Sequence, residues 1–381
     1  MGRRIDYSLF AVSFLHFVND ANVLLIPTVL PLIIEEFGLS FTQVGFLTGM
    51  TAFAMMFLQL PLGYLSDIKG RKYLLSMGIL LVGLGALISG FSKSFLQLLA
   101  AQLILGIGGS FYHPLGYSLT SGLYDRGERG GALGIQSSMG DLGVFTIFLT
   151  NSYLALIGGW RLPLLVFGVL AVLASLLPIL IREDQMINED VIYKSSFKVI
   201  FSRGVLSLLL MYFLTVAAYR IMYSYLPPLL MFKGLKITSI NLIIAAMTFS
   251  GIVGGITVGF LIDKYGEGKP LSILSLTLFA FSLILMKISS IPYIVSTVVV
   301  LGFCIYGLYP GLYSILSRRV GRNILGLTYG FILSIGMSGG FIGTVAAGVA
   351  ADIFNVEITL LIFSFLILAL FVALLIEEIS K

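Results

Sequence analysis

The residues with the clearest capacity for chemistry are three charged side chains inside long apolar runs: Asp20, Asp141 and Arg220. If those runs cross a membrane, a charge at the centre of a span costs about 2.5–3.5 kcal/mol on insertion scales, so it usually serves a function. A buried carboxylate is a suitable proton carrier, because a low dielectric favours its uncharged form. Arg220 can bind an anionic substrate or pair with one of the acids. A structural interpretation stays open, in which the carboxylates bond neighbouring helices and Arg220 forms a permanent ion pair.

Polar side chains accompany these charges at helical spacing. His16 precedes Asp20 by one turn and Asn19 is beside it, so His16 and Asp20 share a helix face. We therefore interpret Asp20, Asp141 and His16 as candidates for proton coupling. The candidates for substrate binding carry polar or charged groups that suit a cavity for amphipathic cargo, although a single tyrosine in a membrane helix can also serve packing. They are Arg220, Asn19, His113, Tyr117, Gln136, Tyr219, Tyr223, Tyr306, Tyr309 and Tyr313.

The composition of the chain indicates the environment of these residues. Of 381 residues, 58% are hydrophobic and only 11% are charged, whereas a soluble domain has roughly 25% charged residues. So few charges cannot cover a water-exposed surface, and we predict a polytopic membrane protein that contacts the lipid bilayer. The net charge of +5 does not indicate nucleic-acid binding, because no basic cluster exceeds a few residues. The single cysteine, Cys304, excludes an intramolecular disulfide.

The apolar runs predict an all-α integral membrane protein with twelve transmembrane helices. Their expected ranges are 7–34, 41–65, 73–91, 94–122, 131–157, 161–181, 205–232, 237–262, 270–289, 291–317, 324–351 and 357–376. The polar segment 182–204 is interpreted as a cytoplasmic linker, and its second half has the pattern of an amphipathic helix at the membrane surface. It separates an N-terminal six-helix bundle, residues 1–181, from a C-terminal six-helix bundle, residues 205–381.

Lysine and arginine are distributed unequally between the two sides of these spans. With the N-terminus inside, all of them face the cytoplasm except the intramembrane Arg220 and five outer residues, Lys93, Arg161, Lys233, Lys236 and Lys287. Because basic loops stay in the cytoplasm, both termini are predicted to be cytoplasmic. The expected location is the plasma or inner membrane of the cell.

The second half of the chain repeats the first at one constant offset. The matching pairs run across five helices, and they include Gly63 with Gly259, Asp67 with Asp263, Pro114 with Pro310, Gly134 with Gly330 and Gly143 with Gly339. This gapless repeat indicates that a six-helix unit has been duplicated with both copies in the same orientation. The binding site is therefore expected at the membrane midplane, between the two halves.

A motif between the second and third spans narrows the fold. It reads Gly63-Tyr64-Leu65-Ser66-Asp67-Ile68-Lys69-Gly70-Arg71-Lys72. At every specified position it resembles the G-x-L-x-D-x-x-G-R-K loop of the major facilitator superfamily, and the spans and the repeat extend the resemblance over the whole chain. The resemblance implies a conformational latch formed by Gly63, Asp67, Gly70, Arg71, Lys72 and, in the second copy, Asp263. The alternative is that these charges only set the topology.

Two further segments resemble the fosmidomycin-resistance branch of that superfamily. The first is His16-Phe17-Val18-Asn19-Asp20, and the second is the stretch from Gly108 to His113-Pro114, followed by a glycine-rich segment from Gln136 to Gly143. The resemblance implies proton-driven export of small drugs or organic anions. The segment Gly140-Asp141-Leu142-Gly143 lacks the proline that drug/proton antiporters carry after these glycines, and this departure weakens an antiport assignment.

These features predict a secondary active transporter that works by alternating access as a monomer. The leading hypothesis is proton-coupled export, by antiport, of a small organic anion or amphipathic drug. The alternative is proton-coupled symport of a carboxylate or other small nutrient, and a lipid scramblase or intramembrane enzyme is the third hypothesis. We expect no enzyme activity and no ATP-driven transport, because no catalytic constellation lies on a large loop and no G-x-x-x-x-G-K-[ST] motif is present. No cofactor is expected, and no metal, because the chain has only two histidines without an evident ligand cluster.

Overall fold

The computed structural model describes residues 7–69, 71–124, 128–181, 203–266, 268–319 and 325–379, and these ranges contain helices and no strand. The first group of helices is α1 (Tyr7–Val23), α2 (Leu25–Phe37), α3 (Phe41–Lys69), α4 (Lys72–Phe91), α5 (Phe95–Leu123), α6 (Arg129–Gly158), α7 (Arg161–Ala174) and the short 3₁₀ helix η1 (Leu177–Leu180). The second group is α9 (Arg203–Phe232), α10 (Ile237–Tyr265), α11 (Gly268–Lys287), α12 (Ile291–Arg319), α13 (Leu325–Ile353) and α14 (Val356–Ile379). The predicted all-α class is confirmed.

The described helices have the length and composition of membrane spans. Eleven of them are long and apolar enough to cross a bilayer, and α14 adds a further apolar helix of 24 residues. A span needs about 20 predominantly apolar residues, and such helices satisfy their backbone hydrogen bonds internally. The predicted linker, residues 182–204 with its surface helix, lies outside the described residues as far as 202, and its last two residues begin α9.

The first span is interrupted beside one of the intramembrane charges. Helix α1 ends at Val23 and α2 begins at Leu25, and together they cover one span from Tyr7 to Phe37. Pro27 accounts for the interruption, because proline lacks an N–H and its ring clashes with the carbonyl four residues earlier, here that of Val23. The break therefore falls one turn after Asp20. Interrupted helices of this kind often line the substrate sites of transporters.

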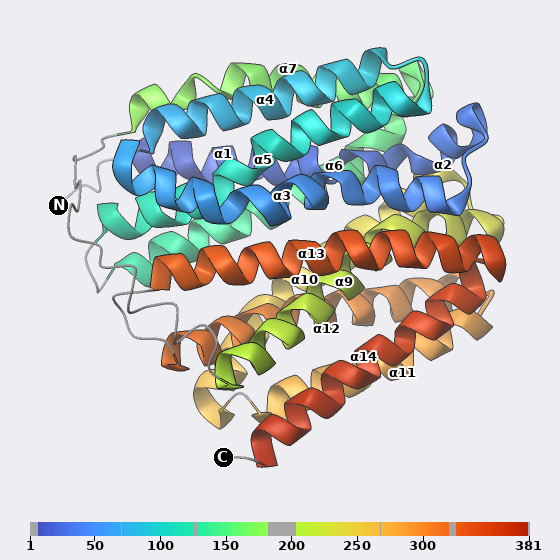
Figure 1. Cartoon of the computed structure of the whole chain (residues 1–381). Coiled ribbons are helices and arrows are strands. Elements are labelled where there is room, and N and C mark those ends of the chain that lie inside the picture. The colour runs from blue at the N-terminus through green and yellow to red at the C-terminus, as the bar shows by residue number, and fades with distance from the viewer. Residues whose placement is uncertain are drawn as a thin grey trace.

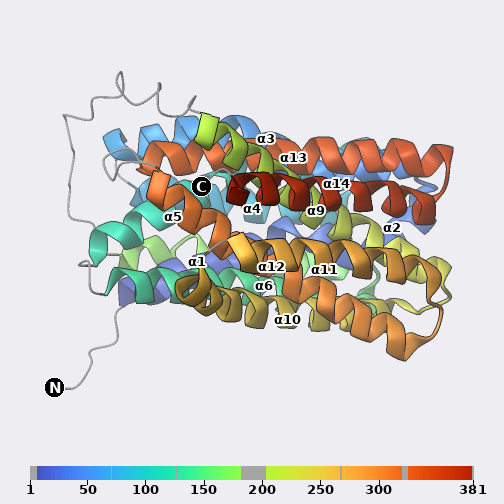
Figure 2. The ribbon, with the colours of Figure 1, turned by 90° about the horizontal axis from the view of Figure 1, so that it is seen from below.

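The two groups of helices lie on opposite sides of the molecule, with α1–α7 in the upper part of Figure 1 and α9–α14 in the lower part. Helices α3 and α13 run side by side where the groups meet, and α6 contacts α10 on the other face, as the view from below also shows (Figure 2). Helix α1 begins and α14 ends at the same end of the bundle, which we call the terminal end (Figure 1). The opposite end is called the distal end.

Hydrogen bonds join the two groups at the distal end. The backbone N–H groups of Phe41 and Thr42, at the start of α3, donate to the carboxylate of Asp352 near the end of α13, at 2.7 and 2.8 Å. A carboxylate at the N-terminus of a helix satisfies free N–H groups and interacts favourably with the helix dipole. Nearby, the Asn241 amide of α10 donates to the backbone oxygen of Thr28 in α2 at 2.9 Å.

Glycines allow α3 and α13 to approach closely at this end. A Cβ atom at Gly45 would lie 2.5 Å from the backbone oxygen of Thr344, and one at Gly348 would lie closer still to the backbone oxygen of Phe41. The Tyr225 hydroxyl of α9 donates to the same Thr344 oxygen at 2.7 Å. Small residues at such crossings let helix backbones come together in a membrane, where packing rather than hydrophobicity drives association. The distal end is therefore closed.

Candidate functional site

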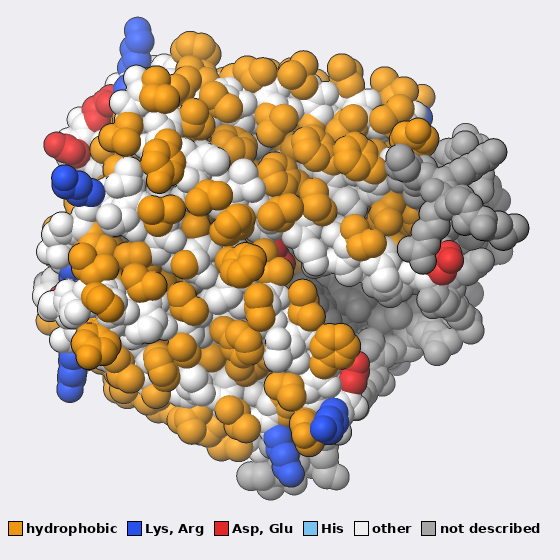
Figure 3. All heavy atoms as spheres, turned by 180° about the vertical axis from the view of Figure 1, so that it is seen from behind, with side chains coloured by type: hydrophobic (Ala, Val, Ile, Leu, Met, Phe, Trp, Pro, Cys, Tyr) orange, Lys and Arg blue, Asp and Glu red, His pale blue; other side chains and the backbone are white. Residues whose placement is uncertain are grey.

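A cavity of about 390 Å³ lies between the two groups of helices. Its wall combines side chains of both groups of helices. Among them are His16, Asp20, Met55, His113, Tyr117, Asp141, Tyr219, Arg220, Tyr306, Tyr309 and Met337. In the space-filling view the surface is hollowed, and an acidic side chain is visible inside the hollow (Figure 3). The cavity lies between the two halves of the repeat, where a binding site was expected, and its role in binding stays a prediction.

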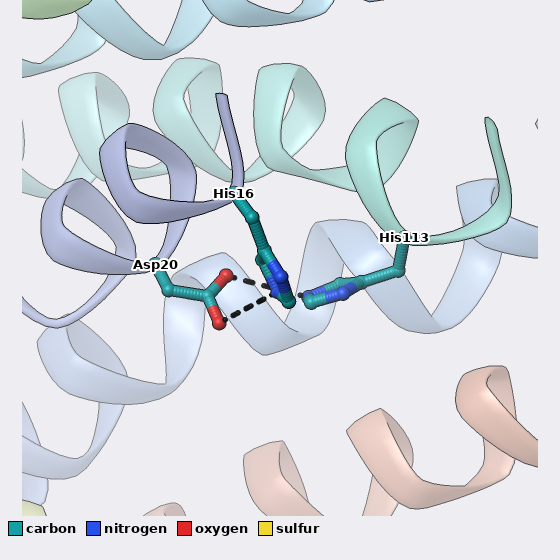
Figure 4. A group of neighbouring side chains, drawn as sticks. All are labelled: His16, Asp20 and His113. Carbon is teal, nitrogen blue, oxygen red and sulfur yellow. Dashed lines mark ion pairs between the residues drawn. The ribbon is translucent and has the colours of Figure 1, made fainter. Parts of the chain in front are cut away.

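A compact cluster of titratable groups forms the wall contributed by α1 and α5. The Nε2 atom of His16 lies 3.2 Å from Oδ2 of Asp20, and the Nε2 atom of His113 lies 3.6 Å from Oδ1 of the same carboxylate. Figure 4 shows both imidazoles pointing toward the carboxylate from two different helices. The helical spacing of His16 and Asp20 predicted their shared face, but the arrival of His113 from α5 depends on how the helices pack.

His16 is fixed on every side, with an exposed fraction of 2%. Its Nδ1 atom lies 2.7 Å from the backbone oxygen of Gln136 in α6, and its ring stacks on Tyr112 with centroids 4.6 Å apart. The Gln136 amide donates to the Tyr112 hydroxyl at 2.9 Å, and that hydroxyl donates to the backbone oxygen of Val12 at 2.8 Å. Gln136 thus positions the cluster from behind and does not line the cavity.

Asp20 is also held in place. The Asn19 amide donates to its Oδ1 atom at 2.8 Å, in addition to the two imidazole contacts. Gly140 of α6 makes room for the cluster, because a Cβ atom there would lie 2.6 Å from Nε2 of His16 and 2.8 Å from Oδ2 of Asp20. Asn19 and Gly140 therefore shape the cluster without facing the cargo space.

Asp141 lies in the same cavity one residue after Gly140. In the part of the chain that the structure describes, its carboxylate makes no ion pair and no hydrogen bond. The two acids therefore differ in their surroundings, since Asp20 is engaged by three side chains and Asp141 faces the cavity.

Arg220 stands on the wall that α9 contributes, and it is 4% exposed. Its guanidinium contacts the Thr51 hydroxyl at 3.3 Å and the Met337 sulfur at 3.8 Å. No carboxylate among the described residues pairs with it. Of the two alternatives for Arg220, pairing with one of the acids is not seen among the described residues, because Asp20 is turned to the histidines and Asp141 to the cavity.

Tyrosines surround Arg220. Tyr219 and Tyr309 line the cavity with ring centroids 6.2 Å apart, and Tyr306 packs edge-on against Tyr219 at 5.6 Å. Tyr223 lies behind them, because its hydroxyl is within 2.8 Å of that of Tyr306 and within 2.7 Å of that of Thr248. This wall offers flat aromatic faces next to a cation. The side chain of Tyr313 lies outside the described residues.

A family model described as Major Facilitator Superfamily matches residues 12–344 and, in a second overlapping match, residues 208–380. The chain belongs to the major facilitator superfamily. Its superfamily consists of secondary transporters and not enzymes, and the chain is accordingly a multi-pass membrane protein that lies in the lipid bilayer.

Individual members of the superfamily are similar to this chain at low identity. The fosmidomycin resistance protein of Escherichia coli K12 is 26% identical over 388 aligned positions, which cover 93% of this chain and 89% of that protein. The probable L-galactonate transporter of the same organism is 30% identical over 142 residues, 37% of this chain and 31% of that protein, so the aligned segment spans less than a third of its length. The first of these relatives agrees with the branch that the His16–Asp20 and His113-Pro114 segments resemble.

Solved structures show the same fold. A bacterial homologue of the human lysosomal transporter Spinster, in an inward-facing and occupied conformation, superposes with a TM-score of 0.81 and 17% identity. The superposition covers all of this chain and 98% of that one.

The motif loop of this superfamily member lies at the terminal end, and its latch role stays a prediction. The Lys72 ammonium donates to the backbone oxygen of Ile179 at 2.9 Å, which joins the start of α4 to η1 within the first group. Asp263 is exposed at the end of α10. Gly63 and Arg71 are described, whereas the side chain of Asp67 and the whole of Gly70 lie outside the described residues.

Met55 and Met337 are cavity residues that the sequence did not reveal. The serines Ser137 and Ser138 of α6 also belong to the wall. An apolar or small side chain in a membrane helix has the same appearance in the sequence whether it faces lipid, a neighbouring helix or a cavity. No signal in the residue types could have identified these four positions.

Proposed function

We propose that this protein is a proton-coupled transporter of small organic anions. It works as a monomer in the plasma membrane, with both termini in the cytoplasm and with two six-helix bundles, residues 1–181 and 205–381, that rock about the cavity. The observation that carries the proposal is the buried guanidinium of Arg220, which faces the same cavity as Asp141 and has no carboxylate partner among the described residues.

The chemistry of Arg220 defines the cargo. A buried cation is costly unless a counter-charge accompanies it, and a guanidinium presents a planar fork that matches a carboxylate or phosphonate. The aromatic faces of Tyr219 and Tyr309 beside it suit an apolar body attached to that anion. The galactonate named in one relative is itself an organic carboxylate. A small anion with an apolar or aromatic part fits this wall.

Asp141 is the group best placed to carry the proton. Its carboxylate faces the cavity and makes no ion pair with the described residues, so it can take up and release a proton without first breaking a contact. Asp20 would have to leave His16, His113 and Asn19 to do the same. His16 and Asp20 remain candidates for a second step of the proton path.

The charges in the cavity decide whether binding of a proton strengthens or weakens binding of the cargo. With Asp20, Asp141 and Arg220 all ionised, the wall carries a net negative charge, which opposes an incoming anion. A proton on Asp141 removes one negative charge, so proton and anion each strengthen the binding of the other. Positive linkage between the two ligands is the requirement for symport, and this arrangement favours uptake of the anion with a proton.

Export by antiport is the second candidate, and the fosmidomycin resistance protein among the relatives supports it. Antiport needs cargo and proton to compete for the cavity. A cationic amphipathic drug would meet that condition, because it would bind against ionised Asp141 and be displaced when that carboxylate is protonated. The two candidates therefore differ in the charge of the cargo and in the sign of its pH dependence.

In the proposed transport cycle, the described conformation corresponds to the inward-open state. The distal end is closed by α3 and α13, and the cavity residues lie on the halves of their helices that lead to the terminal end. With cytoplasmic termini, the cavity would open to the cytoplasm. Transport then requires that the distal contacts separate.

Replacing Gly45 by valine is expected to open the distal end. The new side chain would collide with the Thr344 backbone of α13, and overpacking costs about 1–3 kcal/mol. A bias of that size against the closed state raises the ratio of open to closed molecules about 5- to 150-fold. Spin labels at the exposed positions Ser40 and Asn355 would report a growing long-distance population. Gly259→Val is the matched control, because a Cβ atom there meets nothing within 4 Å, and equal distances in both variants would refute a closed distal contact.

The proposed function is tested with purified protein and a thermal-shift screen of organic acids, followed by transport in proteoliposomes. For one coupled proton, anion affinity is expected to rise up to about tenfold per unit fall in pH in the coupled range. An inward proton gradient should then drive the anion inward. Affinity that falls on acidification, together with outward movement of cargo, would establish antiport instead. Transport that ignores the proton gradient would refute proton coupling altogether.

A further inference from the structure

We propose that His16, Asp20 and His113 form a binding site for one divalent transition-metal ion of the zinc class. These are both histidines of the chain, delivered by α1 and α5 to one carboxylate in the cavity wall (Figure 4). The helical spacing predicts that His16 and Asp20 share a face, but His113 is far from both along the chain, and only the packing of α5 against α1 brings it to them.

The distances from the two imidazoles to the Asp20 carboxylate are close to those of a tetrahedral metal site. Zinc binds imidazole nitrogen and carboxylate oxygen at about 2.0–2.2 Å, so two ligands at the tetrahedral angle lie about 3.4 Å apart. The Nε2 atom of His16 lies 3.2 Å from Oδ2 of Asp20 and the Nε2 atom of His113 lies 3.6 Å from Oδ1, and one ligand atom from each of the three residues lies within 4.8 Å of the other two. A small rotation of the His113 side chain would complete the triangle.

The hydrogen bond behind His16 orients it as metal-binding histidines are oriented. A backbone carbonyl only accepts hydrogen bonds, so the 2.7 Å contact with the Gln136 oxygen places the hydrogen on Nδ1 of His16. The Nε2 atom of the neutral ring then presents a lone pair to Asp20, and although it is buried it has no hydrogen-bond partner among the described residues. Metal-ligating histidines almost always donate their other N–H to a carbonyl or carboxylate in this way.

The unprotonated Nε2 atom of His16 and the Oδ2 atom of Asp20 are both hydrogen-bond acceptors, and they face each other at 3.2 Å. Such a pair needs a proton or a cation between its two atoms. A proton shared by His16 and Asp20 would satisfy that one contact. It would leave the approach of His113 to the other carboxylate oxygen unused, whereas one metal ion can bind both imidazole nitrogens and the carboxylate together. Imidazole and carboxylate ligands suit zinc, cobalt and nickel ions.

The site is accessible and incomplete, because all three side chains also line the cavity. Three protein ligands leave a fourth tetrahedral position open, as in zinc sites that bind water or a small ligand. That position would face the cargo space. Binding of the metal needs neither proton coupling nor a particular cargo, so the site stands independently of the proposed transport function.

The test is a titration of purified, tag-free, full-length protein with Co²⁺, followed by its visible absorption, and equilibrium dialysis with Zn²⁺. We expect one ion per chain and the intense absorption of tetrahedral Co²⁺. The variants His16→Gln and His113→Gln should each weaken binding more than about tenfold, the lower bound for changes around metal ligands. The chain has no other histidine and its one cysteine is buried, so the protein contains no competing site of this kind.

A second kind of variant keeps all three metal ligands and fills the space beside them. Gly140→Ala would place a methyl group 2.6 Å from Nε2 of His16, and we expect it to weaken Co²⁺ binding about tenfold or more. Gly131→Ala on the same helix is the matched control, because a Cβ atom there meets nothing within 4 Å. Size-exclusion profiles establish that each variant is folded. Absence of stoichiometric binding to the unaltered protein, or undiminished binding to His113→Gln, would overturn the proposal.

Discussion

Replacing Arg220 by glutamine is expected to weaken the binding of an anionic cargo by about 30-fold or more. Removing one partner of a buried, hydrogen-bonded charge pair costs about 2–5 kcal/mol, and each 1.4 kcal/mol is a factor of ten. Arg220 is 4% exposed, and among the described residues its guanidinium hydrogen-bonds only to Thr51 and Met337, so an anion would be its principal counter-charge. Calorimetry or thermal shift with the anion found in the screen measures the loss.

The specificity of that loss separates recognition from structural damage. A neutral analogue of the same cargo should lose much less affinity in Arg220→Gln, and Arg220→Lys should recover part of the anion binding because it restores the charge without the planar fork. Lys233→Gln is the control for a general change in charge. Lys233 follows α9 outside the cavity, with its ammonium 3.0 Å from the Ile288 oxygen and 3.5 Å from Glu357. Equal losses for charged and neutral cargo would show that Arg220 is structural.

Replacing Asp141 by asparagine is expected to uncouple transport from protons. The amide is close in shape to the carboxylate but cannot take up and release a proton in this pH range, so cargo-driven alkalinisation outside proteoliposomes should fall at least about tenfold. Exchange of labelled cargo across the membrane at equal concentrations should persist, because that reaction needs no net proton movement. A pH-sensitive dye outside the vesicles and a labelled cargo measure the two activities separately.

Two comparisons make this result decisive. Glu36→Gln is the control, because Glu36 lies at the distal end of α2, where it pairs with Arg161 at 2.6 Å and accepts from Trp160 outside the cavity. Asp20→Asn supplies the contrast, because its carboxylate is engaged by His16, His113 and Asn19. If Asp20→Asn abolishes coupling while Asp141→Asn retains it, the proton is carried by the cluster and the assignment to Asp141 is wrong.

The sequence predicted the spans and the fold because hydropathy is a local property. A bilayer selects helices of about 20 apolar residues, and the motif from Gly63 to Lys72 marked the superfamily. The break after Val23 was not among the expected features, although Pro27 supplies its cause. One expected element, the linker over 182–204, falls almost entirely outside the described residues and stays a prediction.

The candidate site could be predicted only in part. Residue type and depth identified Asp20, Asp141 and Arg220, because a charge inside a span is costly and rare. The same reasoning also selected Asn19, Gln136 and Tyr223 for cargo binding, yet these three lie behind the cavity wall. Which face of a helix meets a cavity depends on the neighbouring helices, and residue type alone does not contain that information.

The sequence by itself determined that this protein is a helical membrane transporter with few intramembrane charges, since length, hydropathy and one motif suffice for that conclusion. The tertiary structure decided which of those charges meet. Packing of α5 against α1 brought His113 to Asp20, and the glycine at position 140 let α6 approach the pair. Arg220 was left facing the cavity with no acid beside it in the described part of the chain. Hydropathy acts on each helix separately, whereas the partners of a buried charge are set by contacts between helices far apart in the chain.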